Sequence, residues 1–438
     1  MPDAPRHDAG SGIPAKGDPV ALHNPALDLR RLGRSGEALA HIERARALGL
    51  RAPETLVARA HLLADLGRFD EAVEQYREVL AGHPELVGAH ESLAKLLPQV
   101  GRGGEALESY RTALALAPGA GLLWVSAMGM AQAVGAHEQL LSWARQARAR
   151  FGADTMISVY EATALAALGA EGAGRDLLVA AIRADPDYDP SYGALAYILL
   201  KLGDAAGAAE AAIDAVRRVP DDQSGWALLG TAWRLLGDPR EPWLCDYDRL
   251  VMTIDLPDLD LPDLAEVLAG LHVASFQPAE QSLRGGTQTR DNLFDRSDPA
   301  IRRLSAVIQR EVEDRLGGLP RDADHPFLRR NSGRIAFSGS WSVRLRDAGF
   351  HINHIHPSGW LSSACYIALP PETRGSRSEG ALTFGVPDSA LGLDLKPSHI
   401  VVPTPGRLVV FPSFFWHGTQ PFASERPRMT VAFDALPA

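Results

Sequence analysis

The stretch Gly349-Phe-His-Ile-Asn-His-Ile-His-Pro-Ser-Gly-Trp360 holds three of the 14 histidines of this 438-residue chain. Successive side chains of a strand point to opposite faces, so His354 and His356 are predicted to project the same way. His351 and Asn353 are predicted to project to the other face. Two imidazoles on one face can share a metal ion. The competing register, which uses His351 with Asn353, ranks below this one.

Two further motifs follow this stretch at a distance. His417 comes 61 residues after His356, in Phe411-Pro-Ser-Phe-Phe-Trp-His417, and Arg428-Met-Thr430 begins eleven residues later. The order is therefore His-x-His, a distant His, and Arg-x-Thr. Arg428 presents a planar fork that suits a carboxylate, and Thr430 reaches the same face of a strand. The alternative is that the histidines are hydrogen-bonding residues of the core, or that they bind zinc.

That order resembles the iron(II)- and 2-oxoglutarate-dependent oxygenases, in which His-x-Asp/Glu and a later His hold iron. In that superfamily an Arg-x-Ser/Thr holds the distal carboxylate of the cosubstrate. The resemblance covers roughly residues 270–438, and it is closest to the branch found behind tetratricopeptide repeats. The further matching stretches are Gln281–Thr289, Trp360–Tyr366 and Phe411–Ser413. The pattern differs at one ligand, because His356 stands where a carboxylate is usual.

The resemblance implies iron(II) and 2-oxoglutarate as cofactors. It implies metal ligation by His354, His356 and His417, and cosubstrate binding by Arg428 and Thr430. Tyr366 is similar to a tyrosine that hydrogen-bonds the same carboxylate in related hydroxylases, and a packed strand aromatic is the alternative. Candidates for supporting the ligands or contacting substrate are His351, Asn353, Trp360, Arg344 and Trp416. If a carboxylate completes the metal site, Asp388 and Glu379 are candidates.

The first half of the chain carries a different signal, a 34-residue period. It is marked by seven glycines: Gly33, Gly67, Gly101, Gly135, Gly169, Gly203 and Gly237. Alanine stands five residues after four of them, and proline stands seventeen residues after four of them. Glycine allows a tight turn, alanine lets two helices approach closely, and proline ends a helix. The period resembles the tetratricopeptide repeat, with two antiparallel helices per unit. Leu140 and Gly174 replace the alanine in two units, where looser packing is expected.

These patterns predict a multidomain α + β protein. Residues 1–20 are expected to be a disordered leader, 21–240 an α-solenoid of tetratricopeptide repeats with a concave binding surface, and 241–265 a linker. Beyond Arg334 the pattern changes to short strands separated by Gly, Pro and Ser turns. Residues 266–438 are therefore expected to form a double-stranded β-helix, or jelly roll.

Net charge and cysteine content limit which classes of partner and which cellular compartment are expected. A formal net charge of -10 argues against phosphate-backbone binding, so no nucleic acid is expected. Cys245 and Cys365 are the only cysteines, which excludes a disulfide framework and favours the cytoplasm. The first twenty residues lack the apolar core of a signal peptide, and no apolar run approaches the roughly 20 residues that cross a bilayer. No membrane association is expected.

The predicted function is an oxygenase that uses dioxygen and 2-oxoglutarate to hydroxylate a C–H bond of a protein or peptide. The concave face of the repeats would recruit that partner. Two alternatives stay open. One is a non-catalytic repeat scaffold with a metal-binding or sensing jelly roll. The other is a small-molecule oxygenase whose repeats serve assembly only.

Overall fold

The computed structural model describes residues 20–257, 259–272, 282–289 and 292–438. These residues form two compact units that divide between Leu123 and Trp124. The expected leader lies outside the described residues except for Val20, and Gln281 of the first matching stretch lies outside them too. No helix in the described ranges combines the length and the hydropathy needed to span a membrane.

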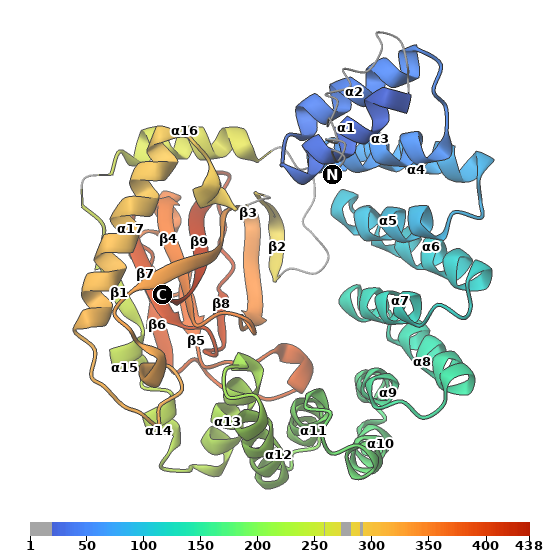
Figure 1. The fold of residues 1–438 in the computed structure, drawn as a ribbon. Coiled ribbons are helices and arrows are strands. Elements are labelled where there is room, and N and C mark those ends of the chain that lie inside the picture. The colour runs from blue at the N-terminus through green and yellow to red at the C-terminus, as the bar shows by residue number, and fades with distance from the viewer. Residues whose placement is uncertain (1–19, 258, 273–281, 290–291) are drawn as a thin grey trace, which may run out of the picture. The chain divides into compact units, whose positions relative to one another are not determined.

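Both units contain the helix pairs that the 34-residue period predicts (Figure 1). The first unit has α1 (Val20–Arg31), α2 (Ser35–Ala47), α3 (Pro53–Asp65), α4 (Phe69–Gly82), α5 (Val87–Leu96) with a short 3-10 turn, Leu97–Val100, and α6 (Gly103–Leu116). Helix α7 (Gly121–Ala133) spans the division. The second unit continues with α8 (His137–Phe151), α9 (Thr155–Ala167), α10 (Glu171–Ala184), α11 (Pro190–Lys201), α12 (Ala205–Arg218) and α13 (Gln223–Leu236).

The seven periodic glycines all lie in turns rather than inside helices. Each has a positive φ, from 64° at Gly237 to 82° at Gly169. This left-handed conformation is costly for residues with a Cβ, which explains why glycine recurs there. The predicted repeat register is confirmed. The looser packing expected at Gly174 is wrong, because a Cβ there would lie 2.8 Å from the carbonyl oxygen of Ala162. Glycine at this position lets α9 and α10 approach more closely.

The remainder of the second unit is a curled antiparallel half-barrel, consistent with a jelly roll. Its strands are ordered β1-β7-β4-β9-β3-β8-β5-β6, with β2 paired to β3. They are β1 (Met252–Asp255), β2 (Leu283–Gln288), β3 (Ile335–His354), β4 (Leu361–Ala368), β5 (Leu382–Phe384), β6 (His399–Val401), β7 (Arg407–Pro412), β8 (His417–Thr419) and β9 (Arg428–Pro437).

Further helices of the second unit lie beside this sheet (Figure 1). They are α14 (Glu241–Leu244), α15 (Tyr247–Leu250), α16 (Leu261–Leu271) and α17 (Pro299–Gly317); the short 3-10 turns are Leu293–Asp295, Leu328–Arg330, Pro371–Thr373 and Ser389–Leu391. Helix α17 buries Ile301, Leu304, Ile308 and Val312 at the three- and four-residue spacing of one helical face. These residues share one hydrophobic core with the buried faces of β4, β7 and β9. Figure 1 shows α17 lying along one side of the sheet.

The segment predicted to be a linker, 241–265, contributes a strand to the sheet and buried residues to its core, so it does more than connect two domains. Strand β1 pairs antiparallel with β7, and Met252 and Ile254 are buried while Thr253 and Asp255 are exposed. This alternation is the pattern of an edge strand with one buried face. Closely spaced prolines and aspartates just after it obscured that pattern in the sequence.

Helix α13, counted as the last repeat helix, is hydrogen-bonded to the sheet domain at three places. The Gln223 backbone N–H donates to the Pro357 carbonyl at 3.3 Å, and the Trp416 indole N–H donates to the Thr231 hydroxyl at 3.0 Å. Arg234 donates to the carbonyl oxygens of Gly385 and Lys396, at 2.6 and 2.8 Å. The helix therefore packs against the sheet domain and also belongs to the repeats.

We expect Arg234→Met to lower the free energy of unfolding of the second unit by about 1.5–3 kcal/mol, because charged hydrogen bonds to two carbonyls are lost. Tryptophan fluorescence during urea unfolding isolates this unit, since all 8 tryptophans lie after residue 123. The matched control is Arg217→Met, which removes an exposed 3.7 Å contact to Asp214 and should change stability by less than about 0.5 kcal/mol. Equal effects of the two substitutions would contradict the claim that the hydrogen bonds of Arg234 stabilise this unit.

Candidate metal and cosubstrate site

Strand pairing brings the three predicted ligand histidines together. His354 ends β3 and lies directly opposite His417, the first residue of β8, while His356 follows two residues after the strand. One ligand nitrogen from each ring lies within 4.8 Å of the other two. Three imidazole nitrogens that share a metal at 2.0–2.1 Å lie about 3 Å apart, so a small contraction of this cluster would suffice.

Hydrogen bonds fix which ring nitrogen is free in each histidine. Nδ1 of His354 lies 2.8 Å from the Ile352 carbonyl, and Nδ1 of His417 lies 2.9 Å from the Phe415 carbonyl. Nδ1 of His356 lies 2.7 Å from a carboxylate oxygen of Asp434. Carbonyl and carboxylate oxygens only accept, so these partners assign the proton to Nδ1 in all three rings. Each Nε2 then carries a lone pair.

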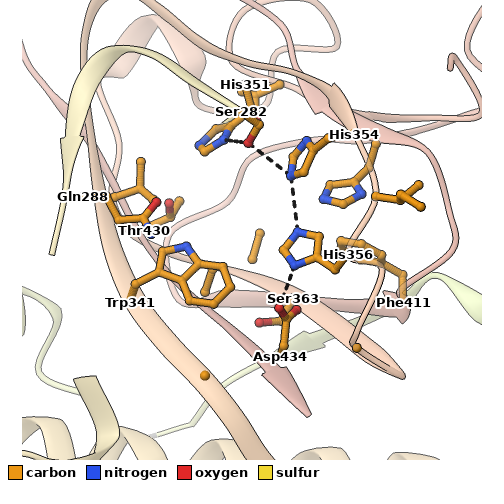
Figure 2. Close-up of a pocket in the computed structure, with 18 of the residues that line it drawn as sticks. Ser282, Gln288, Trp341, His351, His354, His356, Ser363, Phe411, Thr430 and Asp434 are labelled. Atoms are coloured by element: carbon orange, nitrogen blue, oxygen red, sulfur yellow. Dashed lines mark hydrogen bonds and ion pairs between the residues drawn. The ribbon is translucent and has the colours of Figure 1, made fainter. Parts of the chain in front are cut away.

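The nitrogens that carry these lone pairs lie close together. Nε2 of His354 lies 3.2 Å from Nε2 of His356, as Figure 2 shows. In the tautomers assigned above neither atom has a proton to donate, so this contact joins two acceptors. The Ser282 hydroxyl, 3.2 Å from Nε2 of His354, can donate to one of these lone pairs. The donor set therefore fits a divalent metal bound by three nitrogens on one side, as an iron(II) or zinc site requires.

Burial favours the neutral form of two of these rings, His354 and His417. The pKa of His354 is lowered to about 3 by burial and by the neighbouring His356. Burial also holds the pKa of His417 well below its usual range. The nitrogen that binds a metal must be unprotonated, and near neutral pH both rings already meet that requirement.

His351 lies on the cavity side, although strand alternation predicted that it would face away. Its ring centroid is 6.0 Å from that of His354, and its Nδ1 is 3.0 Å from the Ser282 hydroxyl oxygen. The reason is a bulge: His351 and His354 are three positions apart on β3, whereas their partners Thr419 and His417 are two positions apart on β8. Asn353 donates to the Pro387 carbonyl at 3.4 Å and does not line the cavity.

Asp434 is a member of the site that the sequence interpretation did not name. It lies on β9 six residues after Arg428, and Arg428, Thr430, Ala432 and Asp434 all line the cavity. Their even spacing places them on one face of the strand, so strand alternation could have identified Asp434. The carboxylates proposed instead lie elsewhere. Asp388 accepts from the Ala390 N–H and Glu379 accepts from the Ala423 N–H.

The same cavity, of about 650 Å³, contains a buried cation. Arg428 is 2% exposed, and its Nε has no hydrogen-bond partner among the described residues. Tyr366 packs its ring 5.2 Å from the Arg428 guanidinium, and its buried hydroxyl lies next to that group. Burial lowers the pKa of Arg428, and no carboxylate in the described ranges offsets that cost. A buried guanidinium is costly unless paired, so the site suits an anionic ligand.

Three other predicted residues lie away from this cavity. Trp360 is buried, stacks on Phe327 with ring centroids 4.7 Å apart, and donates its indole N–H to the Phe327 carbonyl. Trp416 donates its indole N–H to α13, and Arg344 lies on the face of β3 opposite to Val343, which does line the cavity. Trp341 does line the cavity, where it stacks nearly parallel on His356 at a centroid distance of 5.9 Å.

Comparison with known proteins is consistent with both halves of this description. A family described as "Putative 2OG-Fe(II) oxygenase" matches residues 339–434, and the tetratricopeptide repeat family matches residues 57–121 and 194–241. All three histidines, Arg428 and Asp434 fall within the first match.

Solved repeat proteins resemble the chain weakly. A tetratricopeptide repeat protein from Parabacteroides merdae is 15% identical, with 53% of this chain and 91% of that chain covered and a TM-score of 0.44. Part of a repeat-containing protein from Cytophaga hutchinsonii is 12% identical, with coverages of 49% and 93% and a TM-score of 0.39. MamA from Desulfovibrio magneticus is 18% identical, with coverages of 46% and 96% and a TM-score of 0.29. No curated protein matches the sequence.

Proposed function

We propose that this chain, which carries tetratricopeptide repeats and a 2OG-Fe(II) oxygenase domain, hydroxylates a protein or peptide that the repeats recruit. His354, His356 and His417 would hold iron(II), and Arg428 with Thr430 would hold 2-oxoglutarate. The observation that carries the proposal is one cavity that contains both three clustered imidazole nitrogens and a buried arginine without a carboxylate partner among the described residues.

Iron(II), 2-oxoglutarate and dioxygen supply the oxidising chemistry. One oxygen atom enters a substrate C–H bond as a hydroxyl, and the other enters succinate as 2-oxoglutarate loses carbon dioxide. The protein contributes binding, orientation and exclusion of water. Three neutral histidines would leave a bound divalent metal with its full charge of +2. A dianionic cosubstrate would offset that charge.

The residues around Arg428 suit the distal carboxylate of the cosubstrate. The guanidinium can form a paired hydrogen bond to a carboxylate, and the Thr430 hydroxyl lies on the same face of β9. The Tyr366 ring packs against the guanidinium and limits where it can move. Its buried hydroxyl, which lies next to the guanidinium, offers a further donor to the same carboxylate.

The contacts of α13 support a protein or peptide as the substrate. This helix belongs to the region that matches the repeat family, and it is hydrogen-bonded to residues adjacent to two of the three ligands. Pro357 follows His356, and Trp416 precedes His417. A partner held by the last repeats would therefore be bound close to the metal cavity. Tetratricopeptide repeats are a fold that presents an extended binding surface.

The test is anaerobic reconstitution of the full chain with iron(II), followed by 2-oxoglutarate and dioxygen. We expect one iron per chain at saturation and succinate formation that requires all three additions. Cell extract as the source of substrate should raise the succinate yield, and a hydroxylated peptide should be detected by its mass gain of one oxygen atom. Iron binding without succinate would favour the sensing scaffold. Stimulation only by the low-molecular-mass fraction of the extract would favour a small-molecule oxygenase.

A further inference from the structure

The three histidine ligands do not neutralise a divalent metal, and a carboxylate lies directly behind one of them. We propose that Asp434 is a positioning residue that acts through His356, holding its Nε2 toward the metal and supplying negative charge to the site. The inference rests on the proposed metal site and adds a residue to it. It gives His356 a different role from those of His354 and His417.

The hydrogen bonds of Asp434 are arranged for this role. One carboxylate oxygen lies 2.7 Å from Nδ1 of His356, as the dashed line in Figure 2 marks. The other oxygen accepts a hydrogen bond from the Ser362 hydroxyl at 2.7 Å. Ser362 in turn lies 2.8 Å from the Ser413 hydroxyl, and both serines are fully buried. Strand pairing sets this arrangement, since Ser362 of β4 lies directly opposite Asp434 of β9.

His356 differs from the other two ligands in the partner of its Nδ1. His354 and His417 donate to neutral backbone carbonyls, whereas His356 donates to a carboxylate. A hydrogen bond to an ionised acceptor is roughly twice as strong as one between neutral groups. It also fixes the tautomer and makes the metal-binding nitrogen more basic. His356 would thus be the most basic nitrogen donor of the three ligands.

Two contacts limit the motion of this pair. Trp341 stacks on the His356 ring with an interplanar angle of 13°, so the ring cannot turn about its long axis without losing that contact. The backbone N–H of His356 donates to the Ser413 carbonyl at 3.1 Å, which ties the ligand to the same serine that supports Ser362. Asp434 therefore orients a ring that its surroundings already confine. No Lys or Arg in the described ranges forms an ion pair with Asp434, so its charge is directed at His356.

The test is a double-mutant cycle on metal affinity, measured anaerobically on the full chain with iron(II) and with cobalt(II) by chelator competition. We expect Asp434→Asn to weaken metal binding by roughly 10- to 100-fold. His356→Ala should weaken it more, and adding Asp434→Asn to His356→Ala should have no further effect. The visible spectrum of bound cobalt(II) should change in Asp434→Asn, because the ligand nitrogen becomes a weaker donor. This spectrum gives a readout independent of turnover.

Two further variants make the cycle decisive. Asp434→Glu keeps the charge and should recover part of the affinity, which a packing defect would not. Asp388→Asn is the matched control, since this carboxylate caps a 3-10 turn and is expected to leave metal affinity unchanged. An Asp434→Asn effect of equal size in the His356→Ala background, or no effect at all, overturns the inference. If His417→Ala also leaves metal affinity unchanged, the proposed metal site itself fails.

Discussion

His417→Ala is expected to abolish stoichiometric iron(II) binding and, with it, all iron-dependent succinate formation. His417 is buried, and its Nδ1 is held by the Phe415 carbonyl so that Nε2 faces the cluster. Alanine leaves two nitrogens on a metal that is otherwise open to water. The affinity should fall by more than the roughly 100-fold that loss of a hydrogen-bond partner behind a ligand costs. Equilibrium dialysis followed by metal analysis measures the effect.

His351→Ala is the matched control for this loss. Its ring lies beside that of His354, yet its Nδ1 is 3.0 Å from the Ser282 hydroxyl, and it is not one of the three clustered ligands. We expect this variant to keep one iron per chain. Circular dichroism should show that both variants keep the helical repeats. Retained iron in His417→Ala together with lost iron in His351→Ala would mean that the wrong histidines have been chosen.

These histidines show which side-chain directions strand alternation can predict and which it cannot. Alternation predicted that His354 and His356 would share a face, and their Nε2 atoms lie 3.2 Å apart. The same rule misplaced His351, because a bulge between β3 and β8 adds one residue to one strand only. A bulge depends on the partner strand, and β8 lies some sixty residues further along the sequence. Its position cannot be obtained from the histidine stretch alone.

The repeats were more predictable because their signals are local. A glycine with positive φ ends one helix, and the following residues start the next, so each turn is encoded by neighbours in sequence. What packs against a repeat is not local. Helix α13 follows the repeat period, but Thr231 and Arg234 contact residues more than 150 positions away. The period shows where this helix begins and ends, and it says nothing about the sheet that covers it.

The last expected result concerns cosubstrate recognition. Arg428→Ala should weaken 2-oxoglutarate binding by roughly ten- to a hundredfold while leaving the iron(II) affinity unchanged. The guanidinium is 2% exposed and has no carboxylate partner in the described part of the chain, so a ligand carboxylate is its natural counterion. Losing one charge-assisted hydrogen bond of this kind costs about 1.5–3 kcal/mol. Isothermal titration of the anaerobic iron(II) protein separates the two affinities.

Arg426→Ala is the matched control, because this arginine is exposed, precedes β9 and should not affect either affinity. Stability supplies an independent check. An unpaired buried charge destabilises the ligand-free protein, so Arg428→Met, which keeps much of the side-chain volume, should raise its unfolding midpoint. In wild type, 2-oxoglutarate should raise that midpoint by binding only the folded state, and in Arg428→Met this increase should nearly disappear. A variant that bound 2-oxoglutarate as tightly as wild type would show that Arg428 serves packing alone, and the non-catalytic scaffold would then be the better account of this domain.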